Sequence, residues 1–124
     1  MVLLLDTHVL VWIGLDDPRL SSAVRAALAD ADVQFGVSAV TAYEYEELRV
    51  RNRLGGVDNI GILLSGLNAT LLDFPGEAYR LLPLLPMLHK DPTDRMLIAH
   101  AIHADLTLVT ADTKMREYPV RSLW

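Results

Sequence analysis

A run of aliphatic residues that ends in an aspartate opens the chain and constrains its fold more than any other feature. Val2–Leu5 is apolar on both faces, which is the pattern of a strand buried inside a parallel sheet. Further apolar runs at Val33–Val37, Thr70–Leu72 and Leu106–Val109 alternate with helical patterns. This βαβα order predicts an α/β fold, a three-layer α/β/α domain with a parallel sheet of four to five strands.

The predicted helices begin at residues that favour helix starts. Ser38 is expected to cap a helix that runs to about Leu54, and Asp91, followed by proline, caps another. Glu77–Leu88 also has helical spacing, but its two prolines must kink or divide it. Shorter elements are expected as helices at Val9–Ile13, from Ser21 or Ser22 toward Ala31, and at Asp58–Leu67, and as an edge strand at Val120–Leu123.

Length and composition place the chain among globular proteins with one domain, residues 1–124. A chain of 124 residues that is 52% hydrophobic can bury a substantial core. No apolar stretch approaches the roughly 18 residues of a membrane span, and the aliphatic start lacks the basic segment of a signal peptide. The absence of cysteine excludes disulfides, thiolate catalysis and Cys-ligated zinc. We therefore expect a cytoplasmic location and no membrane partner.

The charge of the chain is unevenly distributed. A net charge of −5 argues against a simple basic nucleic-acid binder, although a carboxylate pocket would contribute negative charge that a bound cation offsets. Positive charge is concentrated at Arg49, Arg51 and Arg53. A basic strip beside an acidic pocket is compatible with a metal-dependent nuclease, in which these arginines, with Arg95 and Lys114, would contact the substrate.

Four acidic residues lie where this fold would gather them. Ligands of parallel sheets bind beyond the carboxyl ends of the strands. Asp6 and Asp112 follow the first and the fourth predicted strands, and Asp94 lies in the first turn of its helix. Glu44 lies two turns into the helix after the second strand and could lean over the same edge. Because four close carboxylates repel one another, they predict a site for a hard cation such as Mg²⁺ or Mn²⁺.

Most of these polar residues also have an ordinary structural explanation. Asp91 fits a helix cap better than a metal ligand, and Asp94 could serve the same cap and the helix dipole. Asp112 could cap the turn that follows it. Thr7 and Thr110 lie at the same strand ends, where they could support a ligand or simply turn the chain.

The acid on the second helix has a competitor. Glu44 and Glu47 share a helix face, and Glu47 can pair with Arg51 four residues on, as surface salt bridges do. Glu44 is flanked on its own face by Val40 and Leu48, where an unpaired carboxylate would be costly. We therefore favour Glu44 and keep Glu47 as the alternative helix acid.

The histidines show no zinc-site spacing of the HxxxH or HExxH kind. We therefore do not expect a catalytic histidine. His89, two residues before Asp91, is the one expected near the acidic pocket. Trp12 and Tyr43 are interpreted as core or partner contacts rather than as platforms for bases.

The segments around the acids resemble the PIN-domain ribonucleases, specifically the VapC-type toxins of prokaryotic toxin–antitoxin pairs. The resemblance lies in an opening strand with its first acid, three further acidic blocks and the tail: Leu3–Trp12, Val37–Glu44, His89–Ala99, Leu108–Asp112 and Tyr118–Trp124. One block alone is a weak signal, but four in order at this spacing are specific. The match spans essentially the whole chain.

Two positions depart from the family pattern. The family often carries a basic residue one turn after the helix acid, where this chain has Leu48. Read backward from Leu54-Gly55, the same pattern would make Glu47 the acid and Arg51 its partner. An aromatic residue is common where this chain has Thr93, which should alter packing or access rather than chemistry.

The resemblance implies a PIN-like fold and hydrolysis of RNA phosphodiester bonds assisted by Mg²⁺ or Mn²⁺. Asp6, Asp94 and Asp112 would be direct or water-mediated ligands, and Glu44 would be a ligand or orient the attacking water. Thr110 or Thr7, with Asp91 nearby, would support these ligands. The resemblance also implies a cognate antitoxin protein and a homodimer.

Two other classes remain as alternatives. A phosphatase-like hydrolase on a related fold would need a second aspartate two residues after Asp6, where this chain has His8. A non-catalytic partner-binding α/β domain would use the acids as caps and surface charges. The presence of all four acids argues against this second class.

Overall fold

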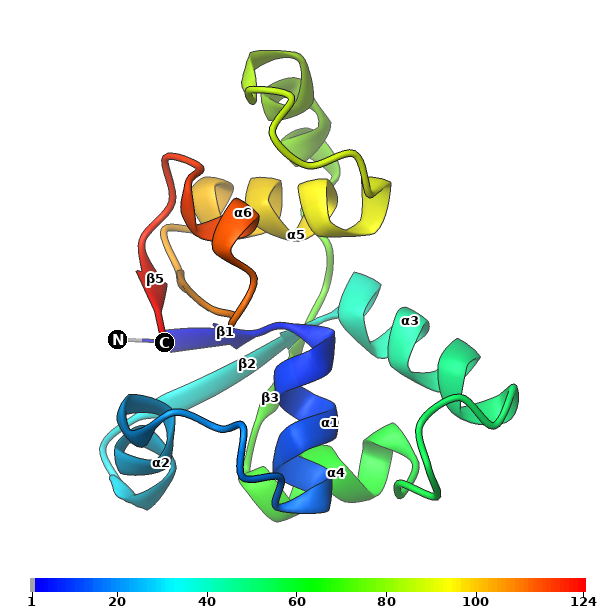
Figure 1. Ribbon diagram of the computed structural model, residues 1–124. Coiled ribbons are helices and arrows are strands. Elements are labelled where there is room, and N and C mark those ends of the chain that lie inside the picture. Colours follow the sequence, from blue (N-terminus) through cyan, green and yellow to red (C-terminus); the bar gives the residue numbers. More distant parts are fainter. Residues whose placement is uncertain (1) are drawn as a thin grey trace.

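The five strands of the sheet are parallel, so their carboxyl ends lie along the same side of the sheet. The structure is a computed structural model and describes residues 2–124. Its sheet has the order β3-β2-β1-β4-β5, with parallel neighbours throughout (Figure 1). The strands are β1 (Val2–Leu5), β2 (Gln34–Ser38), β3 (Thr70–Leu72), β4 (Thr107–Val109) and β5 (Ser122–Leu123). The strand order reverses between β1 and β4, which is the point where sheets of this kind bind ligands.

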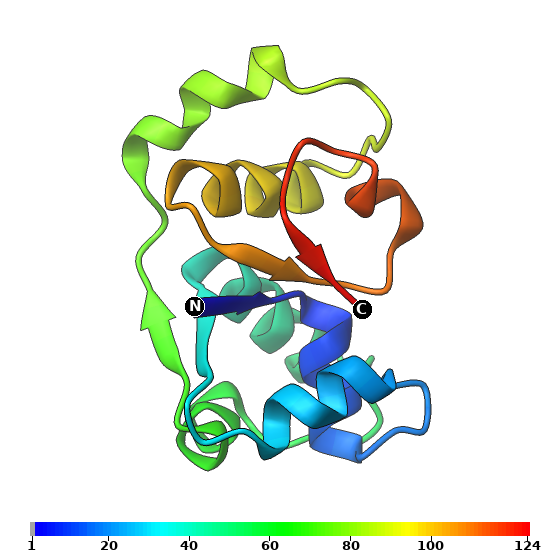
Figure 2. The same cartoon turned by 90° about the vertical axis from the view of Figure 1, so that its left-hand side faces the viewer.

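Helices cover both faces of the sheet and confirm the predicted three-layer α/β/α fold. They are α1 (Thr7–Leu15), α2 (Ser22–Ala29), α3 (Ala39–Val50), α4 (Ile60–Leu67), the 3₁₀ helix η1 (Gly76–Leu84), α5 (Pro92–His103) and α6 (Thr113–Arg116). Helices α1, α2 and α4 lie on one face, and η1, α5 and α6 lie on the other (Figures 1 and 2). Helix α3 follows the carboxyl end of β2 and packs against both α1 and α5.

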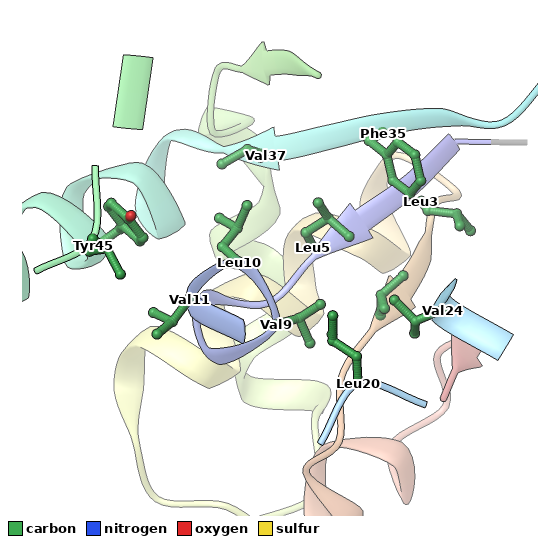
Figure 3. Packing of buried hydrophobic residues seen from close by; sticks show 12 residues of the cluster. Leu3, Leu5, Val9, Leu10, Val11, Leu20, Val24, Phe35, Val37 and Tyr45 are labelled. Carbon is green, nitrogen blue, oxygen red and sulfur yellow. The ribbon is translucent and has the colours of Figure 1, made fainter. Parts of the chain in front are cut away.

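Alternate residues of β1 are buried in different hydrophobic clusters. Leu3 and Leu5 pack with residues of α1 and α2, among them Leu10 (Figure 3). Leu4 belongs to the cluster on the other face, which α5, α6 and β4 also form. The three leucines are no more than 2% exposed. Strand β1 is thus held from both faces, as its aliphatic run predicts, and this fixes the position of Asp6 directly after it.

The caps of the main helices agree with the expected chemistry. The side chains of Ser38 and Asp91 accept backbone N–H groups as the N-caps of α3 and α5. Ser21 is the residue that caps α2. Helix α4 begins one residue later than expected, because the side chain of Asn59, rather than that of Asp58, accepts from Ile62 N.

Other boundaries also differ from expectation. Helix α3 ends at Val50 rather than near Leu54, because Asn52 adopts a φ of 56°, outside the helical region. The proline-containing segment forms the 3₁₀ helix η1, which includes Pro83 and ends at Leu84, two residues before Pro86. Strand β5 is shorter than Val120–Leu123. Within residues 2–124, no helix combines the length and apolar character that crossing a membrane requires.

Candidate metal centre

Asp6 forms the floor of a pocket at the carboxyl edge of the sheet. Its backbone N–H donates to Val109 O at 3.0 Å, which continues the β1–β4 pairing past the end of β1. One carboxylate oxygen accepts from Thr7 N at 2.7 Å, and the other accepts from Thr110 Oγ1 at 2.8 Å. The residue is 5% exposed. Asp6 therefore serves as the N-cap of α1 and is held in one orientation by both strand ends.

Asp94 and Asp112 form the rim of this pocket together with His89. The Nε2 atom of His89 lies 3.0 Å from Asp94 Oδ2 and 3.0 Å from Asp112 Oδ2. One ligand atom from each of the three residues lies within 4.8 Å of the others, which would suit a metal ion. The side chains of Asp94 and Asp112 are 20% and 34% exposed, so the rim faces solvent more than the floor does.

Helix capping makes the pKa of Asp112 differ from that of Asp94. Asp112 caps α6, and its Oδ1 accepts from Lys114 N and Met115 N. Burial raises the pKa of Asp112, but the hydrogen bonds from Met115, His89 and Lys114 outweigh burial and lower the pKa overall. Cap and pocket roles therefore coexist at Asp112.

Asp94 lacks such support from a helix start. Asp91 caps α5 by accepting from Thr93 N and Asp94 N, so the expected cap role belongs to Asp91. The pKa of Asp94 is raised to about 7, first by burial and then by the negative charges of Asp6, Asp91 and Glu44, with His89 acting in the opposite direction. Burial also raises the pKa of Asp6, although its hydrogen bonds oppose the rise.

Glu44 on α3 lies close enough to these carboxylates for its charge to act on two of them. It is partly buried, and its negative charge raises the pKa of both Asp6 and Asp94. Glu47 is exposed and pairs with Arg51 at 3.0 Å. Glu44 as the fourth acid of the site stays a prediction from the sequence, with Glu47 as its alternative.

The neighbouring glutamate on α3 has a structural role that the sequence did not indicate. Glu46 accepts from Ile60 N at 2.7 Å and so supports the start of α4. It also pairs with Arg49 at 2.6 Å. Its pKa is lowered, first by the hydrogen bond from Ile60 and then by that from Arg49. Glu46 thus joins α3 to α4 and is not part of the acidic pocket.

The predicted substrate-contacting cations divide into exposed and buried groups. Arg51, Arg53 and Lys114 are exposed, and Arg49 is partly exposed beside Glu46. Arg95 corrects the expectation, because it is only 9% exposed and its guanidinium is occupied within the protein. It donates to the backbone oxygens of Leu82 and Pro86 at 2.9 Å each and to the hydroxyl of Tyr118 at 3.2 Å. Arg95 therefore links the segment before α5 to that helix through hydrogen bonds.

The aromatic residues also divide by environment. Tyr45 is completely buried in the core. Trp12 packs against Trp124 with ring centroids 5.6 Å apart, and the guanidinium of Arg19 lies 4.7 Å from its ring. Tyr43 is 78% exposed. Of the aromatic residues singled out from the sequence, Tyr43 is thus the one most available to a partner.

His89 is the site residue that sequence reasoning underestimated. Its position near the pocket was expected, but its contact with two of the acids was not. The sequence carries only a weak signal for it, which is its closeness to the Asp91 cap. Its backbone N–H donates to the hydroxyl of Tyr118 at 2.8 Å, a contact that joins residues 29 apart in the chain. The ring is therefore placed by tertiary structure.

The pocket has the donor chemistry of a hard-cation site. It encloses about 260 Å³ and is lined by Asp6, His8, Trp12, Asp94, Ala111 and Asp112. Three of these residues offer carboxylate oxygens, the ligands that Mg²⁺ and Mn²⁺ favour. Burial and the negative charges of Asp6, Asp91 and Glu44 raise the pKa of Asp94, so a cation in the pocket would favour its ionised form. The residues present therefore fit a divalent cation.

Comparison with known proteins gives relatives at both the sequence and the structure level. Ribonuclease VapC22 of Mycobacterium tuberculosis is 30% identical over 118 residues, which span 93% of this chain and 90% of that protein. A chain in the crystal structure of VapBC2 from Rickettsia felis, bound to a promoter DNA fragment, has a TM-score of 0.73 at 18% identity. The alignment covers 99% of this chain and 98% of that one.

A second structural relative and a family model support the same placement. A chain of FitAB bound to a DNA fragment has a TM-score of 0.59 at 22% identity, covering 98% of this chain and 93% of that one. At these identities the solved structures establish the fold alone. The sequence model of the PIN domain matches residues 3–120, which is nearly the whole chain. This chain therefore belongs to the PIN-domain family.

Proposed function

We propose that this protein is a metal-dependent endoribonuclease and the toxin component of a type II toxin–antitoxin pair. The observation that carries the proposal is a pocket lined by Asp6, Asp94 and Asp112 in a PIN-domain fold, with Glu44 close enough for its charge to raise the pKa of Asp6 and Asp94. The similarity to a VapC ribonuclease over nearly the full length supports RNA as the substrate.

The cation that we propose is Mg²⁺ or Mn²⁺, because the pocket offers carboxylate oxygens. Asp6, Asp94 and Asp112 would hold it directly or through water, and Glu44 would be a ligand or orient the attacking water. When bound, the ion would lower the pKa of a water molecule and offset charge on the scissile phosphate. Thr110 supports Asp6 through its hydroxyl, whereas Thr7 does so through its backbone N–H.

Exposed cations are proposed to bind the RNA backbone. Arg49 lies in the last turn of α3, Arg51 and Arg53 follow that helix, and Lys114 lies two residues after Asp112. The salt bridge between Arg51 and Glu47 is solvent-exposed, and such pairs contribute only about 0–1 kcal/mol. A phosphate group can therefore replace the glutamate as the partner of Arg51 at little cost.

The proposed protein partners are a cognate antitoxin and a second copy of this chain. The similar solved structures include toxin–antitoxin complexes. An apolar groove of about 400 Å³ between α3, α4 and β3 is lined by Ala39, Ala42, Tyr43, Glu46, Glu47, Val50, Ile60 and Leu71. Its exposed Tyr43 and Val50 support a protein contact on this side. Light scattering with and without antitoxin would report the oligomeric state.

The two alternative classes are less well supported than a nuclease. A phosphatase-like hydrolase lacks its second aspartate, because His8 occupies that position and is exposed. A purely partner-binding domain would not explain a carboxylate whose pKa is raised to about 7 among other acids. A cytoplasmic location stays a prediction from the sequence.

The first experiment measures Mn²⁺ binding and RNA cleavage with the same preparations. Calorimetry on the wild type is expected to show binding, and Asp6→Asn is expected to remove it. Cleavage of total cellular RNA should require Mn²⁺ or Mg²⁺ and stop with a chelator. Asp73→Asn is the matched control, because Asp73 follows β3 at the same sheet edge but lies outside the pocket.

Two outcomes would contradict the proposal. Undiminished cleavage by the Asp6→Asn variant would show that the pocket is not the catalytic site. A wild type that neither binds Mn²⁺ nor cleaves RNA would support the partner-binding alternative. Equal loss in Asp6→Asn and Asp73→Asn would point to a general effect of charge at the sheet edge.

A further inference from the structure

Both ring nitrogens of His89 have polar neighbours. Nε2 lies 3.0 Å from a carboxylate oxygen of Asp94 and 3.0 Å from one of Asp112. Nδ1 lies 3.2 Å from the backbone nitrogen of Asp91, which donates its hydrogen to the ring. The ring is 17% exposed and therefore lies largely inside the rim. These contacts constrain which nitrogen carries the ring proton.

The contact with Asp91 indicates the tautomer of His89. A backbone N–H group can only donate, so Nδ1 must present its lone pair to it. In a neutral imidazole the proton is then on Nε2, since the hydrogen bond at one nitrogen determines the state of the other. The Nε2–H group then donates to Asp112 Oδ2, and Asp94 Oδ2 lies 3.0 Å from the same nitrogen. This nitrogen then has no lone pair to offer a metal ion.

Hydrogen bonds join the backbone of His89 to the parts of the chain that carry Asp94 and Asp112. Its N–H donates to the hydroxyl of Tyr118, which also receives a hydrogen bond from Arg95 of α5. Tyr118 is 3% exposed and lies just after α6. Helix α5 carries Asp94, and Asp112 caps α6. The ring is therefore held in a fixed relation to both carboxylates.

We propose that His89 is a positioning residue that holds Asp94 and Asp112 at metal-binding spacing, with its Nε2–H donated to Asp112 and Asp94 beside the same nitrogen, and that it is not itself a metal ligand. The proposal rests on the proposed function for the identity of the site. Two carboxylates at this spacing repel each other, and an N–H donor beside both offsets that repulsion. Each carboxylate keeps further lone pairs for the cation. The ligand set would then consist of oxygen atoms alone.

The tautomer can be measured without metal or RNA. Long-range ¹H–¹⁵N correlation spectra of the metal-free wild type, recorded near pH 8, distinguish the Nε2–H from the Nδ1–H form of a neutral imidazole. His89→Phe assigns the signal by its disappearance. We expect the Nε2–H form. An Nδ1–H form, or an equal mixture of the two, would overturn the proposal.

Metal binding tests the positioning role. His89→Phe keeps an aromatic ring without a donor, whereas His89→Gln restores an N–H donor. We expect His89→Phe to weaken Mn²⁺ binding roughly 10- to 100-fold, the range for groups that orient metal ligands, and His89→Gln to recover most of the affinity. His103→Phe is the matched control, because His103 is an exposed histidine at the far end of α5. Unchanged affinity in His89→Phe would overturn the proposal.

Electron spin-echo spectroscopy of bound Mn²⁺ separates positioning from ligation. A directly bound imidazole nitrogen would couple to the ion in the wild type, and we expect no such coupling. Its presence would overturn the inference and leave the proposed nuclease function intact. The opposite result, an Nε2–H tautomer in a wild type that binds no Mn²⁺, would contradict the proposed metal site instead. The two failures are therefore distinguishable, and the spin-echo measurement requires no variant.

Discussion

The floor and the rim of the acidic pocket hold their carboxylates in different ways. Asp6 at the floor is 5% exposed and accepts hydrogen bonds from Thr7 and Thr110, which flank the ends of β1 and β4. Asp94 and Asp112 at the rim are more exposed and lie at the starts of helices, with His89 between them. The floor is thus determined by the sheet, and the rim by a loop and two helices.

This difference shows which carboxylate depends most on a cation. Asp112 receives two backbone N–H groups, which help to lower its pKa. Asp94 lies close to three other acids, and its pKa is raised to about 7. In the metal-free protein the ionised form of Asp94 is therefore unfavourable near neutral pH. A divalent cation would remove that penalty, whereas the protein itself already compensates Asp112.

The largest effect is expected from Asp94→Asn, which removes the least compensated charge of the rim. Activity should fall on the order of 10³-fold, equivalent to about 4 kcal/mol in the barrier. The metal-free variant should nevertheless be more stable by about 1–3 kcal/mol at pH 8. Because the folded-state pKa of Asp94 lies above its usual value of 3.8, the wild type loses stability as pH rises through about 7. Urea unfolding in a chelator measures the difference.

Asp91→Asn is the control for this prediction. Asp91 also raises the pKa of Asp94, but its side chain serves as a helix cap, and asparagine caps equally well. The variant should keep its activity and most of its stability. If Asp94→Asn were no more stable than the wild type at pH 8, the conclusion that the charge of Asp94 is less compensated than that of Asp112 would be wrong.

The choice of helix acid gives the next largest effect. Glu44→Gln should lower the cleavage rate about 100-fold, or about 2.7 kcal/mol in the barrier, because the charge of Glu44 acts on Asp6 and Asp94. Glu47→Gln should leave cleavage nearly unchanged, since it removes only an exposed pair with Arg51. Initial rates on one RNA substrate measure both. An inactive Glu47→Gln beside an active Glu44→Gln would reverse the assignment.

A smaller effect is expected at the floor from Thr110→Val. This change removes the hydroxyl that donates to Asp6 while it keeps the shape of a completely buried side chain. Groups that orient metal ligands typically contribute about 10- to 100-fold, so we expect Mn²⁺ affinity to fall about 10-fold. Thr110→Ser retains the hydroxyl and should bind nearly as the wild type does. Equal losses in both variants would mean that packing, not the hydrogen bond, supports Asp6.

The smallest effect concerns a buried polar group outside the pocket. His100 is 2% exposed and shares a hydrogen bond of 2.9 Å with Ser38, the cap of α3. Burial lowers its pKa, and His103 adds to the shift. Stability from this group is present above about pH 6.5, the usual pKa of histidine, and is lost as pH falls, because the unfolded chain takes up the proton more readily. This direction is opposite to that of Asp94.

His100→Gln tests this opposite dependence. Glutamine can still bond to Ser38 but does not titrate. Urea unfolding at a series of pH values should show a shallower loss of stability on acidification in the variant than in the wild type. If the free energy of unfolding depended on pH equally in the two proteins, protonation of His100 would not contribute to the loss of stability in acid.

Particular residues show how far sequence reasoning reaches. The alternation of apolar runs and helices predicted the fold class, and the Ser38 and Asp91 caps were predicted because capping is a local interaction. The substrate role expected for Arg95 does not agree with the structure, because its partners are the backbone oxygens of Leu82 and Pro86 and the hydroxyl of Tyr118. No short-range pattern distinguishes a buried arginine of this kind from an exposed one.

The sequence by itself determined two features of the site. One is a buried aliphatic strand that is followed by Asp6, and the other is the placement of acids after strands or early in helices. These features depend on periodicity and on neighbours a few residues apart. Tertiary structure alone decided that His89 lies between Asp94 and Asp112, and that Asp94 rather than Asp112 has its pKa raised. The reason is physical, because burial and charge–charge energies depend on distances between segments that are remote in the chain.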